Sequence, residues 1–351
     1  MPVDVAREGP PERLLWRRPF RRSWTAAEAS AVPWGGLLLL PGRSGELLAL
    51  DAATGVARWS RRLPPGVRST PAVSGGVVYV GTGSPGLCRI PWRFSFAALD
   101  VLTGELRWRR RLSSPVAGQP LVDGDSVFFG AEDGVLRCLS AERGELRWQC
   151  SLHSPLRWAP ASEGRLFVGT AGGELSCLDP SSGEQRWCIE LPGAIERRVD
   201  VHGSHLSVVT SEGWIFLVNV DGQVLWERLI AGHRPSAPRA WRGLVLLGGG
   251  SPDEATSGLY ALDITDGRIR FFVPVRGWAR GCPHVEGDAA YLGTTYGAVA
   301  IDLRQGLEQW TFDTEGHLYS SPTGADGRLF LVAQDACYAV TTAALRGEAG
   351  T

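Results

Sequence analysis

The chain of 351 residues carries 36 basic and 37 acidic side chains, which gives a formal net charge of −1. This balance indicates neither a nucleic-acid partner nor a membrane partner. Every basic residue is arginine, so a catalytic lysine is excluded, and the number of arginines alone does not indicate phosphate binding.

The N-terminal segment is polar, and no apolar stretch of signal-peptide length stands near Met1. The apolar run Leu37–Leu40 is far too short to cross a bilayer, so we expect no membrane segment. The seven cysteines are odd in number, which favours a reducing compartment over a disulfide framework. These features predict a cytoplasmic protein with a flexible segment over residues 1–11.

A ten-residue pattern, seen for example in Leu99–Trp108, is repeated along the chain at intervals of about 40 residues. A repeat of this length with strand-like units is typical of β-propellers. We assign its recurring residues a structural role. The aspartate of the pattern is found at Asp51, Asp100, Asp179, Asp263 and Asp302, and the aromatic residue that ends it at Trp59, Trp108, Trp148, Trp187, Trp226, Phe271 and Trp310.

Each copy predicts four strands. In the second copy, Val77–Thr82 is rich in β-branched residues, and Phe96–Asp100 and Glu105–Arg110 flank a turn. An aspartate can accept backbone N–H groups within such a turn, and a glycine allows its positive φ. The tryptophan needs a neighbouring sheet to bury its ring, so the copies must stack.

The two ends of the chain predict one blade more than the seven turns. Three strands without an outermost strand follow Trp310, whereas residues 12–18, with Trp16, form an outermost strand that nothing precedes. We expect this strand to complete the last blade, because closure pairs edges that would otherwise be free. The sequence therefore predicts an all-β, eight-bladed propeller of four-stranded antiparallel blades over residues 12–345, with a flexible segment over 346–351. Seven blades is the alternative.

Prolines mark the innermost strand of the predicted blades. A proline lacks the N–H that a central strand needs, and the innermost strand is an edge that faces the channel. We expect these prolines to occupy one register position, at Pro33, Pro71, Pro120, Pro160, Pro238, Pro283 and Pro322.

Two copies of the repeat carry a family resemblance. Val78–Thr82 with Ala98–Trp108, and Phe167–Thr170 with Cys177–Trp187, resemble the pyrroloquinoline-quinone-like (PQQ-like) propeller repeat. The resemblance implies the propeller fold, in a family that holds both quinoprotein dehydrogenases and non-enzymatic members. The enzymes have a vicinal cysteine pair and a Glu/Asn/Asp calcium site. This chain has no adjacent cysteines and its single Asn219 lies at a turn, so we expect no quinone, no metal and no catalytic residue.

Two connections are longer than the repeat requires, at residues 83–96 and 248–258. Both are expected on the face that carries the connections between blades. The first contains Arg89, Trp92, Arg93 and Phe94, and alternating aromatic and arginine residues are typical of protein-binding hot spots. In the alternative interpretation, Phe94 begins a core strand and Trp92 packs on its own loop.

The connections between blades supply a second set of candidate residues around the channel mouth. Arginines that converge with aromatic residues can bind an anionic or aromatic small ligand. The alternative is an ordinary surface that is rich in arginine because the chain lacks lysine. The candidates are Arg68, Arg157, Trp158, Arg197, Trp278, Arg280 and Tyr319.

Two functions follow from these patterns. The first is a non-catalytic scaffold, monomeric by itself, that binds a protein through the face with the two long connections. The second is a small-ligand-binding protein or quinoprotein-type enzyme that uses the arginine and aromatic residues at the channel mouth.

Overall fold

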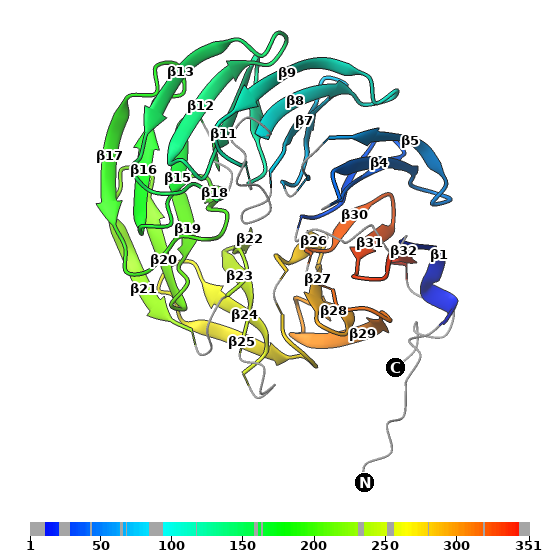
Figure 1. Cartoon of the computed structure of the whole chain (residues 1–351). Helices are drawn as coiled ribbons and strands as arrows, with labels where there is room; N and C mark the ends of the chain where they lie inside the picture. Colours follow the sequence, from blue (N-terminus) through cyan, green and yellow to red (C-terminus); the bar gives the residue numbers. More distant parts are fainter. Residues whose placement is uncertain are drawn as a thin grey trace.

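The computed structural model describes residues 11–20, 29–42, 44–63, 66–67, 69–83, 94–116, 118–157, 161–162, 164–230, 235–250, 256–279, 281–318 and 320–343. These residues form eight four-stranded antiparallel sheets around a central axis (Figure 1). We number the sheets as blades in chain order, starting with the sheet that contains β2. The eight-bladed prediction is confirmed, and the seven-bladed alternative is wrong.

In each of blades 1 to 7, the chain runs from the innermost strand to the outermost strand. Blade 8 contains the last three strands of the chain and, as its outermost strand, β1. The 3₁₀ helix η1 (Pro11–Arg13) precedes β1. Blades 1 to 4 contain β2 (Val32–Trp34), β3 (Leu37–Pro41), β4 (Glu46–Asp51), β5 (Ala57–Arg62); β6 (Ala72–Ser74), β7 (Val77–Gly81), β8 (Phe94–Asp100), β9 (Leu106–Leu112); β10 (Leu121–Asp123), β11 (Ser126–Gly130), β12 (Val135–Ser140), β13 (Leu146–Ser151); β14 (Ala161–Ser162), β15 (Leu166–Gly169), β16 (Glu174–Leu178) and β17 (Gln185–Glu190). Blades 5 to 8 contain β18 (Asp200–His202), β19 (His205–Val209), β20 (Trp214–Asn219), β21 (Val224–Leu229); β22 (Arg239–Trp241), β23 (Leu244–Gly249), β24 (Gly258–Asp263), β25 (Ile269–Pro274); β26 (His284–Glu286), β27 (Ala289–Thr294), β28 (Gly297–Asp302), β29 (Leu307–Asp313); β30 (Thr323–Ala325), β31 (Arg328–Val332), β32 (Ala336–Thr341) and β1 (Leu14–Pro19).

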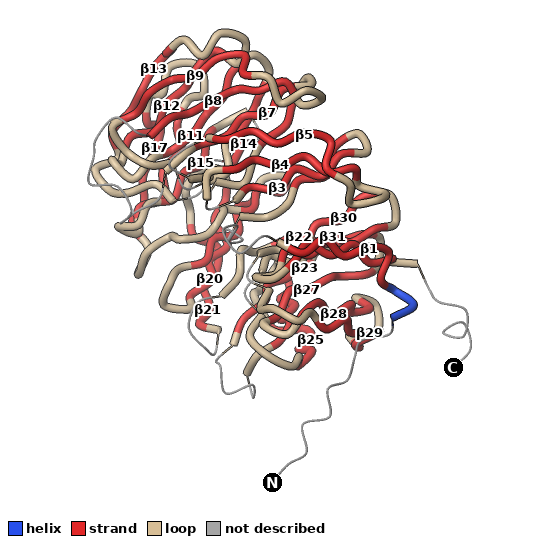
Figure 2. The backbone as a smooth tube through the Cα atoms, turned by 45° about the vertical axis from the view of Figure 1, so that its right-hand side comes forward, coloured by secondary structure: helices blue, strands red, loops and turns tan. Residues whose placement is uncertain are grey.

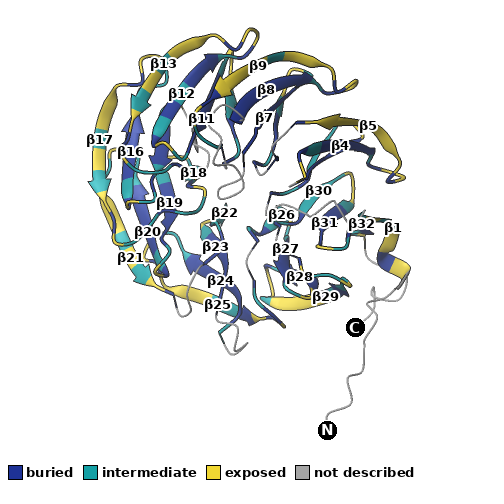
Figure 3. Cartoon of the chain, in the orientation of Figure 1, coloured by how far each residue is buried: buried dark blue, intermediate teal, exposed yellow. Residues whose placement is uncertain are grey.

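The core of the molecule lies between the blades. The second and third strands of each blade are largely buried, and the outermost strands are largely exposed (Figure 3). The buried apolar side chains of the described residues form eight clusters, one at each junction of neighbouring blades. Between blades 2 and 3, the rings of Phe96 and Phe129 stack with their centroids 4.0 Å apart. Each blade therefore buries its apolar faces only when both neighbours are present.

The repeated tryptophans bind each blade to the next. Their indole rings pack over the turn between the third and outermost strands of the following blade, where the pattern places a glycine. The six tryptophans that lie over such a turn also donate their indole Nε1–H to a backbone carbonyl of that blade. The bonds run from Trp16 to Ala52, Trp59 to Val101, Trp108 to Ala141, Trp148 to Pro180, Trp187 to Val220 and Trp226 to Ile264, at 2.9–3.1 Å.

Strand β1 closes the ring, as the sequence predicts. It pairs antiparallel with β32, with Trp16 opposite Ala339 and Arg18 opposite Cys337. Trp16 packs against the core cluster that joins blade 8 to blade 1. Figure 2 shows η1, in blue, directly before β1 at one edge of the ring. First and last segments of the chain thus share one sheet.

Arg13 takes the place that the missing turn leaves in blade 8. Its side chain is fully buried, and the guanidinium carbon lies 4.4 Å from the ring centroid of Trp310. Arg13 Nη1 donates to the carbonyl of Ala343 at 3.0 Å, just beyond the end of β32. In the other blades a turn glycine meets the aromatic ring at this position, so Arg13 both covers Trp310 and joins the two chain ends.

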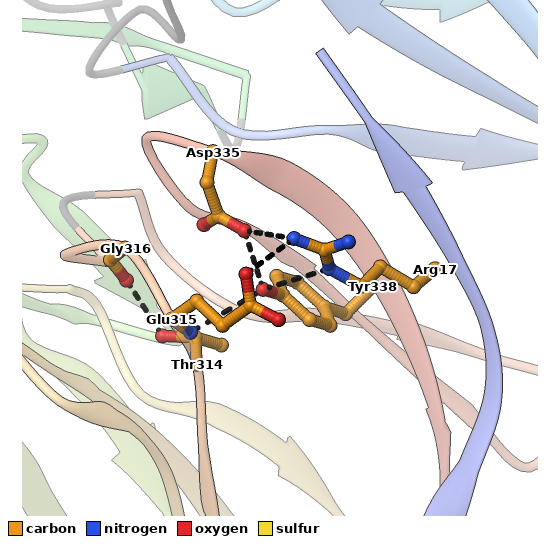
Figure 4. Close-up of polar contacts among 6 residues, drawn as sticks. All are labelled: Arg17, Thr314, Glu315, Gly316, Asp335 and Tyr338. Atoms are coloured by element: carbon orange, nitrogen blue, oxygen red, sulfur yellow. Dashed lines mark hydrogen bonds and ion pairs between the residues drawn. The ribbon is translucent and has the colours of Figure 1, made fainter.

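A polar cluster ties β1 to the junction of blades 7 and 8 (Figure 4). Arg17 Nη2 lies 2.6 Å from Glu315 Oε2 and 3.0 Å from Asp335 Oδ2. The Tyr338 hydroxyl donates to Asp335 Oδ2 at 2.6 Å and accepts from Arg17 Nε at 3.3 Å. On the opposite side of β1, Arg18 Nη1 donates to the carbonyl of Gly55 in blade 1 at 3.0 Å. Both neighbouring blades therefore hold this strand.

The expectation that the prolines share one register position is wrong for Pro33. Pro33 is the second residue of β2 and pairs with Leu38, a displacement of two residues along the strand. Because alternate residues of a strand point their N–H groups to the same side, Pro33 still removes no hydrogen bond to the second strand. Pro160 lies outside the described residues. The remaining prolines each directly precede the innermost strand, namely Pro71, Pro120, Pro238, Pro283 and Pro322.

Candidate functional site

A cavity of about 280 Å³ lies at the channel mouth, where the innermost strands begin. Figure 1 looks along the axis of the ring and shows β18, β22 and β26 near this axis. We call the cavity and its lining residues the channel-mouth cavity. The lining comprises Ser30, Ala31, Val32, Pro33, Thr70, Gln119, Arg197, Arg198, Asp200, Ala237, Pro238, Arg239, Gly281, Cys282, Pro283, His284, Ser321, Pro322 and Thr323.

At the first position of the innermost strands, the polar side chains come from one half of the ring. The first residue of each innermost strand pairs with the third residue of the second strand, except in blade 4, where Ala161 pairs with Phe167, the second residue of β15. In blades 5 to 8 it is polar, and in blades 1 to 4 it is apolar. The residues are Asp200, Arg239, His284 and Thr323 in the first group, and Val32, Ala72, Leu121 and Ala161 in the second.

Three arginines and one carboxylate line the cavity. Arg197 Nε donates to the carbonyl of Pro235 at 3.1 Å, which fixes its side chain. Asp200 Oδ2 accepts from the amide of Ala240 at 2.7 Å, and its Oδ1 lies 3.9 Å from Arg239 Nη1. With Arg198 the cavity has an excess of positive charge, and a concave site concentrates that field.

His284 and Cys282 lie on the same wall of the cavity. Burial lowers the pKa of His284, and its ring stacks on Tyr291 with centroids 6.1 Å apart. A Cβ at Gly324 would lie 2.3 Å from His284 Nε2, so the glycine makes room for the imidazole. Burial also raises the pKa of the Cys282 thiol, although Arg239 acts to lower it.

The cavity residues do not fit the quinone site that the family resemblance implies for its enzymes. Cys282 stands between Gly281 and Pro283, so the vicinal cysteine pair is missing. Asp200 is the single carboxylate of the lining. Within the described residues, no group of three His, Cys, Asp or Glu side chains could hold a metal ion. We therefore derive no reaction step through a quinone.

The structure places three of the expected channel-mouth residues, and they do not form one site. Arg197 lines the cavity. Arg157 instead pairs with Glu196 at 2.6 Å, and the half-buried Trp278 donates its backbone N–H to Thr295 Oγ1 at 3.2 Å. The other expected residues fall outside the described part of the chain, namely Arg68, Trp158, Arg280 and Tyr319.

Sequence reasoning missed Asp200, Arg239, Cys282 and His284. Its search covered the connections before the proline position, whereas three of these four residues begin an innermost strand. A signal was available in the sequence. Comparing the residue that follows each proline position across the copies would have separated the polar blades from the apolar ones.

The two long connections are anchored on opposite sides of the ring. The connection in blade 2 covers residues 82–93, and the one in blade 6 covers residues 250–257. Equivalent connections in the other blades are short, for example residues 131–134 in blade 3. Blades 2 and 6 are diametrically opposed in a ring of eight. Both connections start where a second strand ends, on the same face as the channel-mouth cavity, which we call the insertion face.

Phe94 is a correction to the expected partner surface. It is the first residue of β8, is only 6 % exposed and packs in the core between blades 2 and 3. Its apolar ring is used for packing because the strand begins two residues earlier than expected. Three further candidates, Arg89, Trp92 and Arg93, lie outside the described residues.

Comparisons with known proteins match the chain along nearly its full length. A family model described as outer membrane protein assembly factor BamB matches residues 5–91, 95–159, 135–275 and 255–350. No curated protein matches in sequence. Among the helices of the described residues, none combines the length and the apolar character that a membrane crossing requires.

Solved structures resemble the chain in fold. BamB from Moraxella catarrhalis is 18 % identical, with 93 % of this chain and 96 % of that chain covered and a TM-score of 0.74. The computationally designed Ika8 protein is 14 % identical, with coverage of 94 % and 99 % and a TM-score of 0.77. Quinohemoprotein alcohol dehydrogenase from Comamonas testosteroni is 14 % identical, with coverage of 93 % and 76 % and a TM-score of 0.75.

Proposed function

Because the chain belongs to the BamB-type family of PQQ-like propeller repeats, we propose that it is a non-catalytic scaffold that binds a protein partner through its insertion face. The description of the family model names an assembly factor, and an assembly factor acts on other proteins. The chemistry of the channel-mouth cavity supports the non-catalytic part of the proposal, since burial raises the pKa of its thiol and lowers that of its imidazole, and a backbone amide holds its single carboxylate.

The observation that carries the proposal is the placement of the two long connections. Repeat proteins tend to place function where one copy differs from the others. Here the two deviating copies are diametrically opposed, and both long connections start on the same face. The sequence of the blade 2 connection includes Arg89, Trp92 and Arg93, which are residue types that dominate protein-binding hot spots.

A matched pair of variants tests the proposal. Trp92→Ala alters the insertion face of blade 2, and Leu102→Ala alters an exposed turn of the same blade on the opposite face. Each tagged protein would capture partners from its native host, and quantitative mass spectrometry would compare the variants with the wild type. We expect one or more proteins to be depleted about tenfold by Trp92→Ala and retained by Leu102→Ala, as for a hot-spot residue.

Purified components then decide whether the contact is direct. The captured protein should bind the wild-type chain in calorimetry and lose affinity with Trp92→Ala, while both variants melt within a few degrees of the wild type. Equal binding by all three proteins would contradict a partner site on the insertion face.

A further inference from the structure

We propose that the channel-mouth cavity binds a small organic anion, with a carboxylate or phosphate group at the arginines and an apolar body against blades 1 and 8. The proposal concerns a ligand site and does not depend on the protein partner proposed above. It rests on the unequal lining of the cavity, on its charge and on its size.

The lining of the cavity contains three arginines and one carboxylate. Arg197, Arg198 and Arg239 approach from the neighbouring blades 5 and 6. Asp200 is the single carboxylate among the lining residues, and its distance of 3.9 Å from Arg239 Nη1 is too long for a hydrogen bond. Arg198 makes no ion pair within the described residues. An anionic group would complete this arrangement, because guanidinium groups bind carboxylates and phosphates with strong, oriented hydrogen bonds.

The arginines are not an ordinary consequence of a chain without lysine. The first position of the innermost strand is filled eight times in the ring, and a charged side chain occupies it only at Asp200 and Arg239, in adjacent blades. The four residues of blades 1 to 4 at this position are apolar. A general excess of surface arginine would not confine charged residues to one side of the channel.

The opposite wall sets the rest of the ligand. Ala31, Val32 and Pro33 of blade 1 and Pro322 of blade 8 contribute apolar surface. The polar side chains on this side bond to backbone groups, namely Ser30, Thr70 and Gln119. His284 of blade 7 lies between this surface and the arginines in the order of the blades. A cavity of about 280 Å³ holds a small molecule, and sites of this kind combine an apolar lining with a few oriented polar groups. The ligand class is therefore an organic acid or phosphate ester with a compact apolar body.

Binding of benzoate and phenyl phosphate, measured by calorimetry at fixed ionic strength, tests the proposal. Benzamide has the shape of benzoate without the charge. We expect saturable binding of benzoate or phenyl phosphate, with a dissociation constant of about 0.1–1 mM for so small a probe. The probe that binds more tightly shows whether the site prefers a carboxylate or a phosphate. Benzamide should bind at least about tenfold more weakly.

Three variants locate the site. Arg239→Gln and Arg197→Gln should each weaken the anion about tenfold, because each removes a charge-assisted hydrogen bond. Arg157→Gln is the control, since Arg157 lies near the mouth but pairs with Glu196 and does not line the cavity. If Arg239→Gln fails to fold, the exposed Arg198→Gln replaces it. The proposal would be overturned if neither anion bound, if benzamide bound as tightly as the anions, or if Arg157→Gln lost as much affinity as the cavity variants.

Discussion

At the scale of single residues, one contact recurs between the blades. The tryptophan of one blade lies over the turn glycine of the next, so close that a side chain there would overlap the indole ring. At Gly144 an added Cβ would lie 2.6 Å from Trp108 Cδ2, and the backbone φ is +69°. The same tryptophan donates its Nε1–H to Ala141 at 3.0 Å. The glycine therefore serves both the turn and the packing of the adjacent blade.

Gly144→Ala is expected to destabilise the protein more than Gly124→Ala. Both glycines lie in turns of blade 3 with positive φ, but no atom stands within 4 Å of an added Cβ at Gly124. The positive φ should cost about 1–2 kcal/mol in each variant. Overlap with Trp108 should add about 1–3 kcal/mol in Gly144→Ala. Urea unfolding measures both values, and equal losses would show that the tryptophan contact contributes nothing.

The residues of the candidate site were predicted less well from the sequence than the strands that carry them. Arg197 could be placed at the channel mouth because it precedes an innermost strand, and it lines the cavity. Arg157 precedes one as well, yet Glu196 holds it outside the lining. Arg239 and His284 went unnoticed because their surroundings depend on which strands meet across the channel. The chain sequence specifies the strands, but tertiary contacts decide which side chains converge.

At the scale of elements, the turn between the third and outermost strands is stabilised by its aspartate. Asp51 Oδ1 accepts from the amides of Ala53 and Thr54, and its Oδ2 lies 2.6 Å from Arg58 Nη2. Blade 3 has Ser140 in place of the aspartate, and there Arg147 pairs with Asp125 of the turn between the first two strands. The arginine of the repeat thus keeps a carboxylate partner when the local one is missing.

These turns predict a loss of stability in acid. The Arg58 and Thr54 hydrogen bonds lower the pKa of Asp51 to about 2, and those of Thr265 and Arg270 lower the pKa of Asp263 to about 2. An unfolded aspartate has a pKa of about 3.9. A carboxylate whose pKa is lower in the folded state stabilises the fold above pH 4, and this contribution is lost as the pH falls toward 2.

The measurement is the free energy of unfolding in urea between pH 2.5 and 5.5, in steps of about half a pH unit. Asp263→Asn should have a smaller slope against pH over this window than the wild type. Glu142→Gln is the control, because this exposed carboxylate makes no ion pair in the described part of the chain. A wild-type slope that Asp263→Asn leaves unchanged would contradict the role assigned to the turn.

Elements of the fold were largely predictable because the repeat presents each one several times. Four strands per copy, the aspartate turn and the stacking tryptophan follow from turn chemistry and from the area of an indole ring. The start of β8 at Phe94 was predicted only as an alternative, because this residue follows a segment that no other copy contains. Arg13 was missed because it replaces a turn that occurs in the seven other blades, so the repeat offers no equivalent.

At the scale of the whole molecule, the ring is closed by one strand. Trp16 and Arg18 connect β1 to blade 1, and Arg17 connects it to the junction of blades 7 and 8. Arg13, just before β1, lies against Trp310. Eight blades and this closure could be predicted from a count of the repeats at the two chain ends. Closure also fixes blades 2 and 6 on opposite sides of the ring, so the two long connections start at opposite sides of the insertion face. The cytoplasmic location expected from the cysteines stays a prediction.

The most direct test of the closed ring is a disulfide between β1 and β32. Arg18 stands opposite the native Cys337, and paired strands hold opposite Cα atoms at about 4.5–5.5 Å, within the range of a disulfide. Arg18→Cys, oxidised under mild conditions and digested, should give a peptide in which the introduced cysteine is joined to Cys337. In Arg17→Cys, which stands opposite Tyr338, Cys337 should stay unpaired. Mass spectrometry that finds Cys337 reduced in both variants, or joined between two chains, would contradict the closure by β1.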